Sequence, residues 1–200
     1  MKLLLATRNP GKLREFDRIL AALGLSGLRL VGLADVPVFD EAPETGSTFE
    51  ENALAKARDA LAATGLPAVA DDSGLTVDAL NGMPGVLSAR WAGSAKDDQA
   101  NLALLLEQLA DVPDERLGAA FVCAAALVTS AGDEVVLRRE WRGSIVRKPR
   151  GTNGFGYDPI FVPAGHDVTS AELDPAEKDA ISHRGQALRA LVPHLRELLT

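Results

Sequence analysis

Two adjacent carboxylates, Asp71 and Asp72, follow the short apolar run PAVA at residues 67–70. Neighbouring like charges repel each other and are costly to desolvate together, so we expect a cation to offset that cost. Mg²⁺ takes one or two protein carboxylates plus water and phosphate oxygens. A second aspartate beside it can orient or deprotonate water. The alternative is an Asp-Asp-Ser-Gly turn whose side chains hydrogen-bond their own backbone.

A possible anion site lies in ATRNPGK, residues 6–12. A turn rich in Asn, Pro and Gly before a helix points backbone N–H groups outward, and the helix dipole favours an anion there. Thr7 and Asn9 add side-chain donors, and Arg8 and Lys12 add positive charge. The spacing is not that of a Walker A loop. The alternative is an ordinary strand-to-helix turn with a surface lysine.

Another carboxylate and ammonium occur in EAPETGSTFEENALAKA, residues 41–57. Glu44 lies in a predicted turn, and Asn52 and Lys56 are one turn apart on the helix that follows. Glu44 and Lys56 either belong to a charged site or form part of a solvated face. The pattern leaves these two interpretations evenly balanced.

Aromatic residues and glycines are combined in GTNGFGYDP, residues 151–159. Glycines let the backbone approach a ligand closely, and Phe155 and Tyr157 offer ring faces on which a base can stack. Asp158 could accept a hydrogen bond from a ring N–H. The alternative is a glycine loop with one aromatic ring in the core.

Three hydrogen-bond donors, Lys178, His183 and Arg184, lie close together in EKDAISHRG, residues 177–185. Donors of this kind bind carbonyl or phosphate oxygens. A charged surface turn is the usual alternative.

Hydrophobic periodicity predicts the elements that must position these residues. Thr48 opens a capping box, which predicts a helix that ends at Gly65. The order of strands and helices predicts an α/β fold with a mixed sheet. The predicted strands are 2–6, 67–70, 119–130, 134–143, 144–146 and 159–162, and the predicted helices are 12–24, 48–65, 95–110 and 182–199.

The overall composition suits a single globular domain, residues 1–200. A net charge of −7 predicts no bulk attraction to nucleic acid or to an anionic membrane. Cys123, the single cysteine, lies in an apolar run and is expected to be buried. The first apolar run is too short for a signal peptide and no segment approaches membrane-spanning length, so we expect a cytoplasmic protein.

Five stretches in order resemble the non-canonical purine nucleoside triphosphate pyrophosphatases, the inosine and xanthosine triphosphatases that sanitise nucleotide pools. They are TRNPGK, PETGSTFEENALAKA, ADDSGLTVDALNGMPGVLSAR, GTNGFGYDPIF and EKDAISHRGQAL. Each is modest alone, but five in order are highly specific. The resemblance implies an α/β fold with two lobes flanking a central twisted mixed sheet, a substrate cleft between them, and a homodimer. It also implies Mg²⁺-dependent hydrolysis of ITP, dITP or XTP to the monophosphate and pyrophosphate.

The resemblance implies roles for the charged residues. Asp72 would bind the metal and act as the base that activates water. Glu44 and Asp71 would complete the metal site, and Lys56 would neutralise phosphate or carboxylate charge. Ser73 would touch the substrate. The residues expected to hold the phosphates are Thr7, Arg8, Asn9, Pro10, Gly11 and Lys12.

For the base, the resemblance implies that Phe155 stacks on the purine. Lys178, His183 and Arg184 would reach its six-position oxygen and the neighbouring edge. Adenine presents an amino donor there, which would leave these buried donors unpaired, so adenine should be rejected. The remaining residues expected to line the base pocket are Gly156, Tyr157 and Asp158.

Two other functions use the same residues less well. A non-catalytic nucleotide sensor is possible on any such fold, but a pure binder needs no base beside the metal. The pair Asp71-Asp72 and Lys56 therefore favours an enzyme. A phosphotransferase could use the same anion site, but the chain has no Walker A loop or kinase motif.

Overall fold

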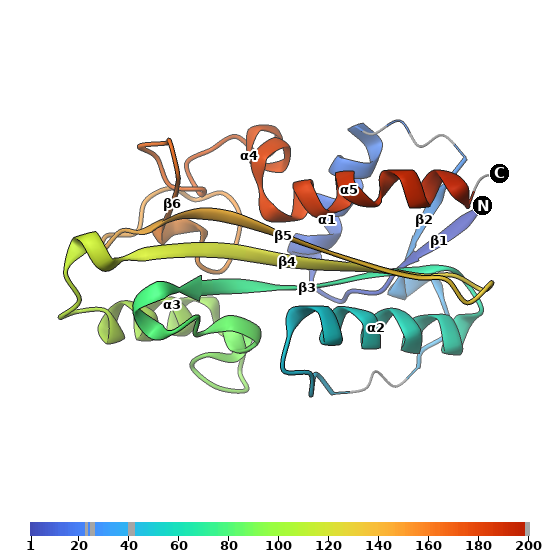
Figure 1. The fold of residues 1–200 in the computed structure, drawn as a ribbon, viewed down its shortest axis with the longest axis horizontal. Helices are drawn as coiled ribbons and strands as arrows, with labels where there is room; N and C mark the ends of the chain where they lie inside the picture. The colour runs from blue at the N-terminus through green and yellow to red at the C-terminus, as the bar shows by residue number, and fades with distance from the viewer. Residues whose placement is uncertain (23, 25–26, 40–42, 199–200) are drawn as a thin grey trace. The chain divides into compact units, whose positions relative to one another are not determined.

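The computed structural model describes residues 1–22, 24, 27–39 and 43–198. Its strands form one six-stranded sheet in the order β2-β1-β3-β4-β5-β6 (Figure 1). β1 pairs in parallel with both β2 and β3, whereas β5 and β6 pair antiparallel, so the sheet is mixed, as predicted. The strands are β1 (Lys2–Leu5), β2 (Arg29–Gly32), β3 (Ala68–Val77), β4 (Gly118–Val128), β5 (Glu134–Ile145) and β6 (Phe161–Pro163).

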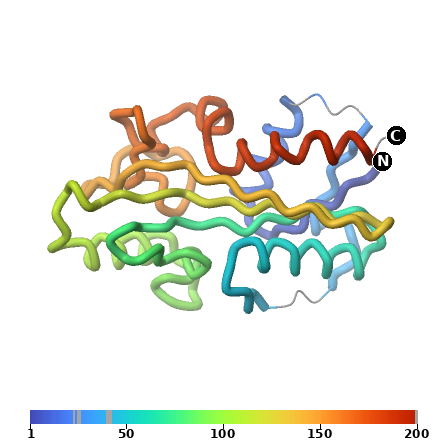
Figure 2. Tube along the Cα trace, in the orientation of Figure 1, coloured from blue at the N-terminus to red at the C-terminus, as the bar shows by residue number. Residues whose placement is uncertain are grey.

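The helices flank this sheet, which makes the fold α/β. β4 and β5 are consecutive and adjacent, and the chain reverses between them at residues 129–133, where the Thr129 N–H donates to the Asp133 carbonyl (Figure 2). The helices are α1 (Pro10–Ala22), α2 (Phe49–Thr64), α3 (Asp98–Gln108), α4 (Pro175–Ile181) and α5 (His183–Glu197). None of the described helices is long and apolar enough to cross a bilayer.

The chain divides into two compact units. The first unit comprises residues 1–72, 123–139 and 184–200, and the second comprises 73–122 and 140–183. Strands β3, β4 and β5 each contribute residues to both units. Each unit has its own apolar core, which includes Phe16 and Leu188 in the first and Leu105, Trp141 and Phe161 in the second.

Helix α2 confirms the capping prediction. The Thr48 hydroxyl accepts from the Glu51 N–H at 3.1 Å, and the Glu51 carboxylate accepts from the Thr48 N–H at 3.2 Å. These contacts satisfy N–H groups that the first turn of a helix leaves without partners. The helix ends at Gly65, whose left-handed φ of +69° suits glycine.

Strand β3 is longer than the pattern indicated. The predicted strand ended at residue 70, but β3 continues to Val77 and includes both Asp71 and Asp72. The Asp-Asp-Ser-Gly turn considered as the alternative is therefore wrong. Charged residues are tolerated in this buried strand because each carboxylate is paired with a cation.

Other elements differ in detail. Segments 134–143 and 144–146 form a single strand, and 159–160 belong to the short 3₁₀ helix Asp158–Ile160, so β6 is shorter than predicted. The pattern missed β2 and α4 because four and seven residues are too few to show a clear period. Leu199, the predicted end of the last helix, lies outside the described residues.

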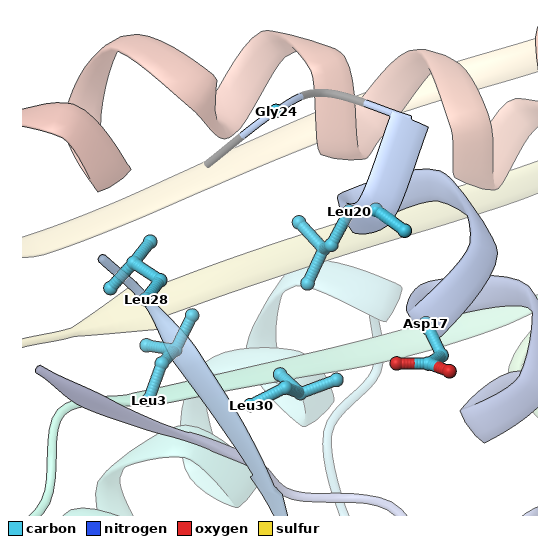
Figure 3. Close-up of a pocket in the computed structure, with 7 residues that line it drawn as sticks. Leu3, Asp17, Leu20, Gly24, Leu28 and Leu30 are labelled. Atoms are coloured by element: carbon cyan, nitrogen blue, oxygen red, sulfur yellow. The ribbon is translucent and has the colours of Figure 1, made fainter. Parts of the chain in front are cut away.

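A pocket of about 370 Å³ lies in the first unit, beside α1, β1 and β2 (Figure 3). Among the described residues, its wall is mostly leucine, and Asp17 is the one charged residue. An apolar wall offers nothing to a phosphate, and the pocket contains none of the site residues predicted above. The described residues that line it are Leu3, Asp17, Leu20, Ala21, Gly24, Leu28 and Leu30.

Candidate active site

Asp72 lies on the side of β3 that α2 covers, and α2 brings it two partners. Lys56 Nζ is 2.8 Å from Asp72 Oδ1 and 2.5 Å from Glu44 Oε1, so one ammonium bridges two carboxylates. Asn52 Nδ2 donates to Asp72 Oδ2 at 3.2 Å. Asn52 and Lys56 meet the same carboxylate because residues four apart lie on one helix face.

In this cluster, burial and the neighbouring opposite charges shift each pKa in opposite directions. Burial raises the pKa of the Asp72 carboxyl, and the positive charges of Lys56 and Lys12 only partly offset this. Burial lowers the pKa of Lys56, but the charges and hydrogen bonds of Asp72 and Glu44 together outweigh burial, so the pKa of Lys56 is raised. Lys56 is therefore a stable cation beside a carboxylate that is a stronger base than an exposed aspartate.

Asp71 belongs to a different cluster on the other face of β3. Lys12 Nζ on α1 is 2.8 Å from Asp71 Oδ2, and Arg184 Nε on α5 is 3.4 Å from the same oxygen. The Arg184 guanidinium also pairs closely with Glu15 on α1. Figure 1 shows α1 and α5 on the side of β3 opposite α2. Neighbouring strand residues point to opposite faces, which explains the separation of the two aspartates.

This second cluster is buried and charged. Burial would raise the pKa of Asp71, but Lys12 and Arg184 outweigh it and hold that pKa well below its usual range. Glu15 and Asp71 together outweigh the effect of burial on Arg184, so the guanidinium pKa is raised. Burial and the Asp71 charge raise the pKa of the Cys123 thiol to about 12. Cys123 is fully buried, as predicted.

At the start of α1, side chains of the preceding segment already accept hydrogen bonds from some of the backbone N–H groups that could bind an anion. Asn9 Oδ1 accepts from the N–H groups of Gly11 and Lys12, at 2.8 and 3.1 Å, and thereby caps the helix. Thr7 Oγ1 accepts from the Asn9 N–H at 3.2 Å. Arg8, Asn9 and Pro10 are exposed, while Thr7, Lys12 and Ser73 are half-buried.

In the second unit, Asp158 is a buried acceptor for three groups. Its Oδ2 accepts from Lys178 Nζ at 2.6 Å and from the Phe155 N–H at 2.8 Å, and its Oδ1 accepts from Ser170 Oγ at 2.7 Å. The sequence placed Asp158 and Lys178 in the base pocket. The structure brings them together with Phe155, and the ammonium of Lys178 lies 5.4 Å from the centre of the Phe155 ring.

The other aromatic groups are more deeply placed. Tyr157 is buried, and its hydroxyl donates to the Ser88 carbonyl at 2.8 Å. The His183 ring is buried and stacks on Phe121, with ring centres 5.0 Å apart. Phe155 is half-buried. Among the three aromatic residues predicted for the base pocket, it has the most exposed ring.

The structure divides the predicted donor group. Lys178 and His183 belong to the second unit, whereas Arg184 belongs to the first and pairs with Asp71 and Glu15. Sequence reasoning missed Glu15 and Ser170. A signal for Glu15 existed, since it lies three residues after Lys12 among the buried positions of α1. Ser170 carried no signal, because its partner Asp158 is twelve residues away in an irregular segment.

The donor set around Lys56 fits a hard divalent cation. Among the described residues, no three histidine, cysteine or acidic side chains form a metal-binding group. Glu44 and Asp72 nevertheless converge on one ammonium. Two carboxylates that share a cation offer the oxygen chemistry that Mg²⁺ uses, and the remaining ligands would come from water and phosphate.

Comparisons with known proteins agree over nearly the whole chain. The model of the Ham1 family matches residues 3–194. A dITP/XTP pyrophosphatase of Nocardia farcinica is 68% identical over 197 residues, which are 98% of this chain and 96% of that protein. One from Mycobacterium tuberculosis H37Rv is 66% identical over 199 residues, covering 100% and 97%.

Solved structures are similar as well. The crystal structure of a nucleoside-triphosphatase / dITP/XTP pyrophosphatase from Mycobacterium abscessus has a TM-score of 0.78 and 65% identity, with 98% of this chain and 100% of that chain covered. A HAM1 protein from Coxiella burnetii has a TM-score of 0.86 and 45% identity, covering 98% and 99%.

Proposed function

Because this chain belongs to the Ham1 family, we propose that it hydrolyses ITP, dITP and XTP to the nucleoside monophosphate and pyrophosphate. The observation that carries the proposal is the cluster in which Lys56 bridges Glu44 and Asp72. A buried carboxylate with a raised pKa, held by a lysine and an asparagine, suits a general base. The same cluster argues against a protein that only binds nucleotides.

Mg²⁺ is the proposed cofactor. Glu44 and Asp72 would hold it, and the family resemblance adds Asp71, which in the structure pairs with Lys12 and Arg184. When bound, Mg²⁺ would neutralise phosphate charge and act as a Lewis acid. Replacing Asp71 or Asp72 with asparagine, one at a time, and titrating Mg²⁺ by calorimetry with ITP present, would separate a ligand from a supporting residue.

Asp72 would take the proton of the attacking water. The water oxygen would form a bond to the α-phosphorus and so become part of the monophosphate, while the anhydride bond between the α- and β-phosphates breaks and pyrophosphate leaves. Asn52 and Lys56 would keep the Asp72 carboxylate oriented during this step. The proposed phosphate-binding side chains are those of residues 7–12, with Lys12 and Lys56 as the half-buried cations nearest the two aspartates.

Base recognition is proposed for the second unit. The half-buried Phe155 would stack on the purine, and Gly156 and Tyr157 would shape the pocket beside it. Lys178 stands over the Phe155 ring and is the best placed donor for the six-position oxygen. The other residues proposed to bind the substrate are Ser73, Asp158, His183 and Arg184.

An endpoint assay with Mg²⁺ tests the function. ITP, dITP, XTP, GTP and ATP are offered separately, and pyrophosphate is distinguished from orthophosphate. Pyrophosphate from the first three, with little from GTP or ATP, is the expected result. Tight ITP binding without release of either product would replace the enzyme with a nucleotide sensor. A phosphorylated acceptor would point to a phosphotransferase.

A cytoplasmic location and a homodimer complete the proposal. The family resemblance supports the dimer. Light scattering after size-exclusion chromatography should give twice the mass of the 21.1 kDa chain. The mass of one chain would contradict it.

A further inference from the structure

We propose that Asp98, the first residue of α3, is a positioning residue that fixes the Phe155 ring for base binding. It acts through the backbone of Gly156. This inference rests on the proposed function, because it assigns a purpose to the loop of residues 151–157, called here the Phe155 loop. Asp98 was not among the residues that the sequence singled out.

The geometry concerns the two peptide groups on either side of the Phe155 Cα atom. The N–H of Phe155 donates to Asp158 Oδ2 at 2.8 Å, and the N–H of Gly156 donates to Asp98 Oδ2 at 2.9 Å. Each flanking peptide group is therefore held by a carboxylate. Fixing both peptides fixes the two backbone dihedrals of Phe155, and these limit the directions in which its ring can point.

The two carboxylates differ in where they come from. Asp158 is buried and lies next to the Phe155 loop in the sequence, three residues from the Phe155 N–H that it accepts from. Asp98 is exposed and lies 58 residues from Gly156 in the sequence. Asp98 therefore ties the backbone of Gly156 to helix α3 of the second unit.

Helix α3 gives Asp98 a rigid base. Asp97 caps the helix, because its Oδ1 accepts from the N–H groups of Gln99 and Ala100 at 2.8 and 3.0 Å. Leu102 and Leu105 on the same helix are buried in the core of the second unit. The two adjacent aspartates thus have different partners: Asp97 caps the helix, and Asp98 accepts a hydrogen bond from the Phe155 loop.

The charge of Asp98 also affects Tyr157, the residue after Gly156. Burial, and then the negative charge of Asp98, raise the pKa of Tyr157. Gly156 has a left-handed φ of +63°, a conformation that suits glycine, and its N–H is the group that donates to Asp98. The half-buried Phe155 therefore has hydrogen-bonded peptide groups on both sides of its Cα atom.

The test compares three variants by ITP hydrolysis. Asp98→Ala removes the acceptor, and we expect KM to rise roughly ten-fold, the effect of losing one hydrogen bond to a charged group, with kcat within about two-fold of wild type, because binding energy alone is lost. Asp98→Asn keeps an acceptor oxygen and should restore most of the affinity. Gln99→Ala is the matched control: Gln99 is exposed on the same turn of α3 as Asp98, so this change should leave KM unchanged.

Calorimetric binding of inosine monophosphate gives a second readout that needs no turnover. Asp98→Ala should weaken this binding in the wild-type background and have no further effect in a Phe155→Ala background. Unchanged binding in Asp98→Ala, or an equal loss in both backgrounds, would overturn the inference. A wild-type protein that binds inosine monophosphate but does not hydrolyse ITP would overturn the proposed function alone. A wild-type protein that does neither would overturn both.

Discussion

Asp71 and Asp72 have separate partners because a β-strand directs successive side chains to opposite faces. Asp72 meets Lys56 and Asn52 from α2, and Asp71 meets Lys12 and Arg184 on the other face. The repulsion expected between adjacent carboxylates is therefore offset twice, by two sets of protein cations. Substituting one aspartate leaves the partners of the other in place, so their contributions can be measured separately.

The first prediction uses this separation. Asp72→Asn keeps the shape of the side chain but cannot accept the proton from water, so kcat for ITP should fall at least about 100-fold. Asp71→Asn removes a charge from a buried ion-pair cluster and should lower stability by about 3 kcal/mol. Activity assays and urea unfolding measure the two effects. Asp72→Asn should change stability much less than Asp71→Asn, and an Asp72→Asn protein with normal kcat would contradict the assignment.

The sequence predicted that a cation must accompany the aspartates, but not which cation goes with which carboxylate. That outcome depends on β3 continuing past residue 70, and the apolar pattern indicated an end at the first charge. Arg184 shows the same difficulty. It is adjacent to His183 in the chain, yet Glu15 and Asp71 hold it in the first unit. Ion pairs between residues more than a hundred positions apart leave no local trace.

At the scale of elements, α2 places the proposed catalytic groups. Its first turn is fixed by the reciprocal bonds of Thr48 and Glu51, and Ser47 Oγ donates to the Glu51 carboxylate at 2.9 Å. Asn52 and Lys56 follow within the next two turns. This helix was predicted within a residue at both ends because its caps are local sequence signals. Strand β2 was missed because its pairing with β1, not a local signal, defines it. Helix α4 has a local start signal, the capping box of Asp174 and Glu177, but its seven residues are too few to show a helical period.

The second prediction concerns that cap. Thr48→Ala removes the hydroxyl that accepts from Glu51 and should lower the free energy of unfolding by about 1 kcal/mol. Thr45→Ala is the control, since Thr45 is an exposed residue of the same segment outside the capping box. Urea unfolding at 25 °C measures both. An equal loss in the two variants would show that the capping contact contributes nothing.

At the scale of the whole molecule, three strands pass through both compact units. If one of these strands loses its hydrogen bonds in one unit, the part of the same strand in the other unit loses the ordered chain that continues it. Each unit has its own core, and we expect the covalent continuity of β3, β4 and β5 to couple their unfolding. Two cores joined through shared strands should unfold together, as small cooperative proteins do.

The third prediction tests that coupling with probes the chain already carries. Trp91 and Trp141 report on the second unit, and Cys123 reports on the first. Cys123 is fully buried with a pKa of about 12, so a thiol reagent at pH 8 should label it only after unfolding. Tryptophan fluorescence and thiol labelling should therefore give the same urea midpoint.

Leu105→Ala makes that test decisive. Leu105 is fully buried in the second unit, so its truncation should cost about 2–5 kcal/mol. If the units are coupled through the shared strands, the labelling midpoint of Cys123 must fall with the fluorescence midpoint, although the substitution lies in the other unit. If the Cys123 midpoint stays at its wild-type value while fluorescence shifts, the first unit is stable without the second, and β3, β4 and β5 do not transmit the loss.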